Sequence, residues 1–189
     1  MVTERIGKET GARGEPLFAL HLVERSGAPA RTVYDLLADL GAHAEWGGRR
    51  QKSKKYRLTS IEAPPGPAGV GTEFTSTGVD PGGRFTDSSV VTEATQPGVF
   101  EFVTEARQQP KRGEIREWTC IHRYEITPRD AGCQIAYSIL VMRLSPAAWW
   151  TRSRATKGLV RKISGSFVRG GLRALARMAE ERAGTRSAS

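Results

Sequence analysis

The sequence has no asparagine, only two cysteines and no apolar run that approaches the length of a membrane span. A helix that crosses a bilayer needs about 20 predominantly apolar residues, so the sequence excludes an integral helical membrane protein. Residues 1–16 are charged and lack the apolar segment of a secretory signal peptide. We therefore expect a cytoplasmic protein, in which thiols stay reduced.

Motifs for metal and nucleotide sites are also absent. The chain has no C-x-x-C pair, no H-E-x-x-H, no P-loop spacing, no G-x-S-x-G and no G-x-G-x-x-G. Cys120, His122 and Cys133 have the side chains of zinc ligands, but the predicted hairpin places Ile126 opposite Cys133. The two cysteines then lie about 20 Å apart, too far for a disulfide or a shared metal. We expect no metal and no cofactor.

Positive charge is concentrated at the end of the chain. The net charge is +9, and residues 152–189 contribute +8 from ten basic and two acidic residues. Such a surface can contact nucleic acid, anionic lipid or an acidic protein. Arginine greatly outnumbers lysine, which is typical of a GC-rich genome, so a solvated basic surface without a specific partner is the simpler interpretation.

The order of elements is the strongest signal for the fold. One strand is followed by a helical pair, six strands and a long basic helix, an order typical of an antiparallel sheet with its helices on one face. We predict a single α+β domain over residues 17–183, with disordered tails at 1–16 and 184–189. The predicted strands are Leu17–Arg25, Tyr56–Glu62, Gly71–Val79, Arg84–Thr95, Val99–Arg107, Ile115–Thr127 and Cys133–Leu144, and the predicted helices are 30–40, Ala42–Trp46 and Lys157–Ala183.

Alternation places aromatic side chains on one face of the later strands. Phe100 and Phe102 share one face, while Glu101 and Glu105 point the other way. The following strands add to the aromatic face Trp118, Cys120, His122, Tyr124, Ile126, Ile135, Tyr137, Ile139 and Val141. Such a surface forms either a plain core or the lining of a ligand site, and the alternation leaves both readings open.

The last helix is expected to press a narrow apolar stripe onto the sheet. Its members fall within roughly 60° of the helical wheel and are Val160, Ile163, Phe167, Ala174 and Met178. Gly170 and Gly171 lie on or near the stripe. Because glycine is unfavourable in a helix by about 1 kcal/mol relative to alanine, the pair indicates space for a ligand, close packing or a kink. A basic row runs beside the stripe, consisting of Lys162, Arg169, Arg173 and Arg177.

Several segments together resemble the START-like, or SRPBCC, superfamily, and within it the polyketide cyclase/dehydrase and lipid-transport group. The matching segments are the first strand leading into APARTVYDLLADL, Trp46, VGTEF (Val70 to Phe74), VVTEATQPGVFEFVTEA and AGCQIAYSI. They span about residues 17–183, and Cys133 stands where the family usually has threonine. The resemblance implies a helix-grip fold, in which a seven-stranded curved antiparallel sheet wraps around a long C-terminal helix and encloses an apolar cavity.

We predict that the protein binds a hydrophobic small molecule, polyketide-like or lipid-like, in that cavity, and that any enzymatic activity resembles a polyketide cyclase/dehydrase. The candidate catalytic residues are His122 and Tyr124, and the alternative for His122 is a hydrogen-bonded core histidine. The candidate ligand-binding residues are Trp46, Phe100, Phe102, Trp118, Tyr137, Phe167 and Gly171. Arg84 or Arg143 could neutralise an acidic group of the ligand.

The alternative function is a non-catalytic lipid carrier that acts at anionic membrane surfaces. Trp149 and Trp150 stand beside Arg152 and Arg154, and tryptophan with basic residues is typical of membrane interfaces. A nucleic-acid partner is not expected, because no helix-turn-helix or RNP pattern accompanies the basic residues from Arg49 to Arg57.

Overall fold

A computed structural model of the protein describes residues 14–50, 56–145 and 154–187, and within the last helix the side chains of residues 168–184. The strands are β1 (Phe18–Ser26), β2 (Arg57–Glu62), β3 (Glu73–Asp80), β4 (Gly83–Thr95), β5 (Val99–Gln109), β6 (Arg116–Arg129) and β7 (Gly132–Leu144). The helices are α2 (Ala30–Ala38), α3 (Leu40–Ala44), the π-helical turn η1 (Glu45–Arg49) and α4 (Arg154–Ser187).

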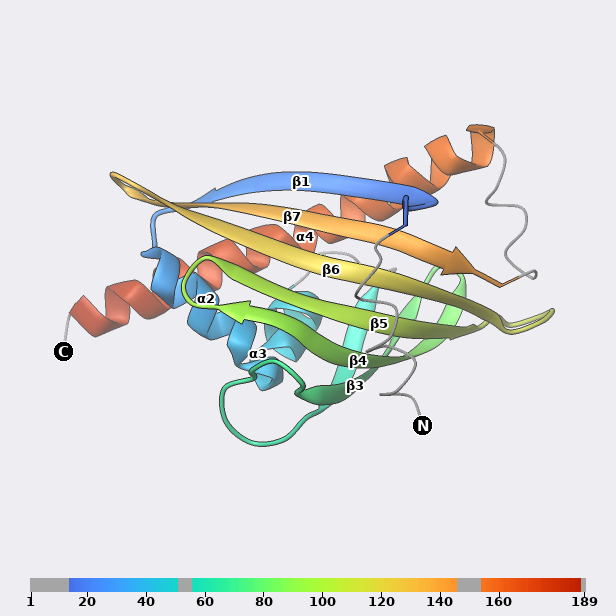
Figure 1. Ribbon diagram of the computed structural model, residues 1–189, viewed down its shortest axis with the longest axis horizontal. Coiled ribbons are helices and arrows are strands. Elements are labelled where there is room, and N and C mark those ends of the chain that lie inside the picture. The colour runs from blue at the N-terminus through green and yellow to red at the C-terminus, as the bar shows by residue number, and fades with distance from the viewer. Residues whose placement is uncertain (1–13, 51–55, 146–153, 188–189) are drawn as a thin grey trace.

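The strands form one seven-stranded antiparallel sheet in the order β1-β7-β6-β5-β4-β3-β2. Successive strands from β2 to β7 are neighbours, and β1 closes the series beside β7. Helices α2, α3 and α4 lie together on one side of the curved sheet (Figure 1). This arrangement is the helix-grip fold, so the α+β fold class expected from the order of elements is confirmed.

The sheet separates two apolar clusters, which define its two faces. The main core joins α2, α3, Trp46 and α4 to one face, here called the inner face. A smaller cluster contains only strand residues and lies on the opposite, outer face. It consists of Val90, Val103 and Ile121 with the partly buried Leu140 and Met142, here called the outer strip.

Helices α2 and α3 are positioned by a buried aliphatic row and a capping aspartate. Val33, Leu36 and Leu37 have no exposed surface, as their helical spacing predicts. The predicted helices 30–40 and Ala42–Trp46 put the break between them at residue 41, but this is wrong. The break falls at Asp39, whose carboxylate accepts a hydrogen bond from the backbone N–H of Ala42 and so begins α3.

The hairpin between β6 and β7 is tighter than the sequence predicted. Arg129 pairs with Gly132, so the turn contains two residues, and Ile126 faces Ile135 rather than Cys133. The expected register was therefore wrong by two residues. Cys120 faces Val141 and Cys133 faces Pro128, and both thiols are buried and free. The expectation that they do not form a disulfide is confirmed.

Helix α4 is buried over a wider arc than the predicted stripe. Ala174 and Met178 are buried as expected, but Leu175 and Ala179 have no exposed surface at all. The extra burial arises because α4 contacts β1, α2 and η1 together. The basic row beside the stripe is exposed at Arg169, Arg173 and Arg177, whereas Lys162, Val160 and Ile163 lie outside the described side chains.

Candidate functional site

The inner face of β5, β6 and β7 forms a continuous aromatic wall. Phe102 stacks on His122 with ring centroids 4.7 Å apart, and Tyr124 stacks on Tyr137 at 4.2 Å. The cross-strand pairs Phe102–His122 and Tyr124–Tyr137 explain these contacts, because paired residues project on the same side. Phe100 completes the wall and is fully buried. Alternation alone had predicted this grouping.

Trp46 closes one side of this wall from the helical layer. Its ring makes an edge contact with Tyr124 at 6.4 Å and lies 4.6 Å from His43. The side chain is 7% exposed, and its Nε1–H has no hydrogen-bond partner. Gly48 in the same turn has no side chain, which lets η1 approach the carbonyl oxygen of Leu58. A buried donor without a partner can donate to a bound molecule.

A chain of hydrogen bonds runs along the wall from Cys120 to Tyr124. The Sγ of Cys120 lies 3.2 Å from Nε2 of His122, and Nδ1 of His122 lies 2.6 Å from the hydroxyl of Tyr137. A further hydrogen bond joins Tyr137 to Tyr124.

One assignment of the protons gives every group in this chain a donor or an acceptor. The Cys120 thiol donates to His122, the Nδ1–H of His122 donates to Tyr137, and the Tyr137 hydroxyl donates to Tyr124. This direction agrees with the bond raising the pKa of Tyr137 and lowering that of Tyr124. The hydroxyl proton of Tyr124 is then left to donate to another group.

Burial keeps the members of this chain uncharged near neutral pH. His122 retains some exposed surface, but burial by the surrounding protein, together with the smaller effect of His43, lowers its pKa to about 4. Burial also raises the pKa of Cys120 and of Tyr124 above their usual ranges. Because the His122 imidazole is neutral and both of its nitrogens form hydrogen bonds, it orients its neighbours and is poorly suited to transfer a proton.

Asp87 is an inner-face group that the sequence reasoning missed. It projects on the same side as Phe85 and Ser89 on β4, and its Oδ1 is buried without a hydrogen-bond partner. Burial, together with the smaller effect of the Asp80 charge, raises the pKa of Asp87 to about 7. The sequence does contain a sign of this placement. Asp87 stands two residues after the apolar Phe85, and residues two apart in a strand project on the same face.

Polar groups continue from Asp87 toward the aromatic wall. The hydroxyls of Ser89 and Thr104 lie 2.9 Å apart and are buried. Tyr56 stacks on Phe85, and burial, together with the charge of Asp87, raises its pKa above the usual range. Asp87 and Tyr124 share the inner face but lie at different heights, because Asp87 faces Ala106 and Tyr124 faces Phe100, six residues or about 20 Å along β5.

The remaining predicted site residues fall into three groups. Trp118 lies on the inner face opposite Ala106 and is half-buried, and Gly171 is buried on α4. Phe167, Trp149 and Trp150 lie outside the described side chains. Arg84 and Arg143 were expected near the ligand, but this is wrong. The alternation of β4 turns Arg84 to the outer face. A register shift after Val141 turns Arg143 to the same face, where it lies 3.9 Å from Glu105.

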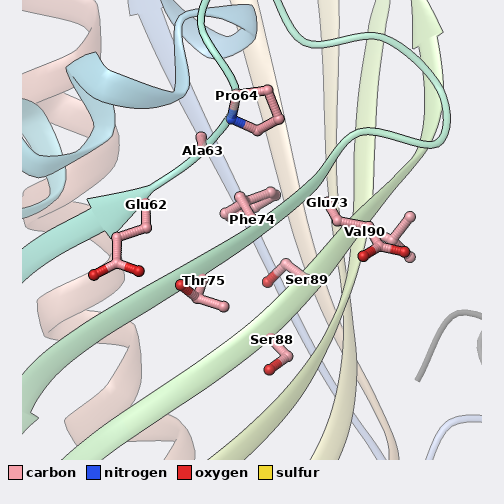
Figure 2. Close-up of a pocket in the computed structure, with 9 residues that line it drawn as sticks. All are labelled: Glu62, Ala63, Pro64, Glu73, Phe74, Thr75, Ser88, Ser89 and Val90. Atoms are coloured by element: carbon pink, nitrogen blue, oxygen red, sulfur yellow. The ribbon is translucent and has the colours of Figure 1, made fainter. Parts of the chain in front are cut away.

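A depression of about 460 Å³ opens on the outer face rather than under the helices (Figure 2). Glu73 and Thr75 of β3 line it with Ser88 and Val90 of β4, and the segment Ala63–Pro64 borders it. These strand residues alternate with inner-face residues, which fixes the side on which the depression lies. The inner-face residues Phe74 and Ser89 also line it, and Phe74 packs against Phe102 of the aromatic wall with ring centroids 5.3 Å apart.

Within the described residues, no cluster of three or more histidine, cysteine, aspartate or glutamate side chains could hold a metal ion. In the same part of the chain, no helix is long and apolar enough to cross a membrane.

The chain resembles solved structures only at the level of the fold. Protein CV1439 of Chromobacterium violaceum superposes with a TM-score of 0.60 at 13% identity, over 86% of this chain and 98% of that one. An uncharacterised protein of Rhizobium leguminosarum gives 0.61 at 13% identity over 86% and 94%. Ara h 8.0201 gives 0.56 at 14% identity over 85% and 96%. No protein-family model and no curated protein matches the sequence.

Proposed function

We propose that the protein binds a hydrophobic small molecule, polyketide-like or lipid-like, between the inner face of the sheet and α4. The observation that carries the proposal is the aromatic wall, which ends in a hydrogen-bond chain terminating at Tyr124. His122, Trp118 and Asp87 are only half-buried although they lie on the face that carries the helices, so they retain surface that a ligand can contact. Apolar linings with a few convergent polar groups are typical of small-molecule sites.

The chemistry of the site fits a polyketide cyclase/dehydrase, the activity that the family resemblance implies. Ring closure begins when a base removes a proton from a carbon next to a carbonyl group. The carboxylate of Asp87 is suited to take that proton from a ligand carbon beside it. The Tyr124 hydroxyl, about 20 Å farther along the sheet by strand register, is suited to donate to a carbonyl oxygen at the other end of an extended ligand. The resulting carbon nucleophile attacks a second carbonyl carbon, and Asp87 returns the proton to the new alkoxide.

His122 has a positioning role in this scheme. Its two hydrogen bonds hold Tyr137, and Tyr137 in turn holds Tyr124. The sequence-based hypothesis gave the proton transfer to His122, but its neutral, doubly engaged imidazole is less suited to that step than the carboxyl group of Asp87.

Ligand binding is tested first by filling the site. Native mass spectrometry of the purified protein weighs any retained ligand, and an anilinonaphthalene dye reports apolar binding. Gly171→Leu should abolish dye binding while the circular dichroism spectrum is kept. The matched control is Gly184→Leu, because Gly184 is exposed on the same helix with no heavy atom within 4 Å of an added Cβ. Unchanged dye binding by Gly171→Leu would refute the site.

Catalysis is tested separately with a synthetic poly-β-ketone thioester. Asp87→Asn and Tyr124→Phe should each remove most of the turnover and keep dye binding, whereas the core variant Tyr34→Phe should retain it. His122→Gln should lower turnover less than Asp87→Asn does. Turnover by Asp87→Asn at the wild-type rate would exclude Asp87 as the base. If neither the wild-type protein nor any variant converts the thioester, the protein binds ligands without acting as a cyclase.

A second candidate function is a lipid carrier at anionic membrane surfaces. The supporting observation is the exposed row Arg169, Arg173 and Arg177 at four-residue spacing on α4, although Arg173 also lies 3.2 Å from Glu24. Trp149 and Trp150 are the side chains that the sequence offers for contact with the membrane interface. Binding should require anionic vesicles and weaken with salt, and equal binding to neutral vesicles would exclude this function. The cytoplasmic location stays a prediction under both functions.

A further inference from the structure

The inner face of the sheet is packed unevenly along its strands. At one end, Phe100 and Ile135 have no exposed surface and Tyr124 is 4% exposed. About 20 Å farther along β5, Asp87 and Trp118 are only partly buried. These exposed fractions are those of the whole chain, so a molecule from solution can contact both side chains at this end of the inner face.

Asp87 and Trp118 stand on either side of Ala106. Ala106 of β5 pairs with Asp87 of β4 and with Trp118 of β6, so the three side chains form one row across the inner face, here called the Ala106 row. The two end strands of the row lie two strand spacings apart, about 10 Å. On the strand between them, the row contains only the methyl group of Ala106, which is not among the described members of the main core.

The two ends of the Ala106 row offer different contacts to a ligand. The Oδ1 of Asp87 is buried without a hydrogen-bond partner, so the carboxylate can accept a hydrogen bond from a ligand hydroxyl group. The indole of Trp118 keeps exposed surface on which a flat ring can stack. A saturated hydrocarbon chain would leave the carboxylate oxygen without a donor, whereas a ring with a hydroxyl substituent uses both contacts.

We propose that the Ala106 row binds an aromatic ring that carries a hydroxyl group. The ring lies over Ala106 and against Trp118, and its hydroxyl group donates to Asp87. The inference rests on the proposed function, because it concerns the same inner face, and it favours a polyketide-like ring over a lipid chain at this end. Ala106 then limits the size of the ligand, since a larger side chain at this position would occupy the place of the ring.

The first test locates a probe in the wild-type protein by NMR, with 2-naphthol as the ligand. Nuclear Overhauser contacts should join the ring protons of 2-naphthol to the methyl group of Ala106. The methyl group of Ala136 is the internal control, because Ala136 is partly exposed on the outer face of β7 and should show no such contact.

The second test separates shape from hydrogen bonding with matched probes and variants. 2-Methylnaphthalene has nearly the shape of 2-naphthol but lacks the hydroxyl group, and displacement of the anilinonaphthalene dye measures the affinity of both. Asp87→Leu should weaken binding of 2-naphthol about tenfold and leave that of 2-methylnaphthalene unchanged. Ala106→Leu should weaken both probes by about tenfold or more, and Ala136→Leu should weaken neither.

The contrary outcomes distinguish this inference from the proposed function. Overhauser contacts of 2-naphthol with core methyl groups such as those of Leu175, and not with Ala106, would overturn the Ala106 row alone. Equal weakening of both probes by Asp87→Leu would exclude the hydrogen bond to Asp87. Failure of the dye and both probes to bind the wild-type protein would refute the proposed function as well. If Ala106→Leu does not fold, the Overhauser contacts in the wild-type protein decide.

Discussion

The guanidinium group of Arg123 lies 2.9 Å from the carboxylate of Glu101, a side chain with no exposed surface. Arg123 also binds Glu93 and Glu125, and the hydroxyl of Thr92 donates to Glu101 at 2.9 Å. Paired, hydrogen-bonded charges of this kind are tolerated in a protein interior, whereas removal of one partner leaves the other charge uncompensated.

Arg123→Met should therefore destabilise the protein by about 3–5 kcal/mol. The change removes the cation that compensates Glu101, and urea unfolding measures the loss. Arg129→Met on the same strand is the control, because Arg129 is exposed and its loss should have little effect. A loss below about 1 kcal/mol, in the range of surface pairs, would show that Glu101 is compensated by other groups.

Asp87→Asn should stabilise the protein at alkaline pH. The folded-state pKa of Asp87 is about 7, above the ordinary value of 3.8, so the folded state holds this proton more tightly than the unfolded state does. Stability should fall as pH rises from about 4 to 7 and then level off. Removing the carboxyl group should therefore give about 2–4 kcal/mol at pH 8 and nearly nothing at pH 4.

Urea unfolding of wild type and Asp87→Asn across this pH range measures how much of the change in stability comes from ionisation of the Asp87 carboxyl group. Asp130→Asn in the exposed turn between β6 and β7 should leave the pH profile of wild type unchanged. Parallel profiles for Asp87→Asn and wild type would mean that the Asp87 carboxyl group ionises normally in the folded protein.

His122→Gln should make the protein less sensitive to acid. Burial lowers the folded-state pKa of His122 to about 4 from the ordinary 6.5, so its contribution is present above pH 6.5 and is lost as pH falls toward 4. The expected loss for this imidazole is about 3 kcal/mol, and glutamine does not titrate. His21→Gln on the exposed side of β1 is the control. An unfolding profile of His122→Gln that declines as steeply as wild type would assign the acid sensitivity to other groups.

Local patterns predicted the order of strands and helices along the chain and the aromatic wall, because both follow from short-range rules. The period of two in β5 places Phe100 and Phe102 together, and pairing with β6 brings His122 and Tyr124 beside them. The hairpin register failed because Pro128 and Arg129 extend β6, leaving a turn of two residues. No local pattern reports that extension.

Features that depend on several distant segments could not be read from the sequence. Asp87 stands in a polar run of β4, and only its parity with Phe85 shows that it faces inward. Glu101 was correctly placed opposite Phe100, but its complete burial depends on Arg123 of another strand. The direction of the hydrogen-bond chain from Cys120 to Tyr124 likewise requires the spatial arrangement of two strands.

Gly48→Ala should displace Trp46 from the aromatic wall. A Cβ at position 48 would overlap the carbonyl oxygen of Leu58, a backbone atom of β2 that cannot rotate away. The turn η1 must then move, at a cost of about 1–3 kcal/mol. Gly69→Ala is the matched control, because no heavy atom lies within 4 Å of the added Cβ. The indole N–H signal of Trp46 should shift in Gly48→Ala and stay in place in Gly69→Ala, and binding of the apolar dye should weaken only in the former. If Gly48→Ala shifts the signal but binds dye as wild type does, Trp46 belongs to the core and not to the ligand site.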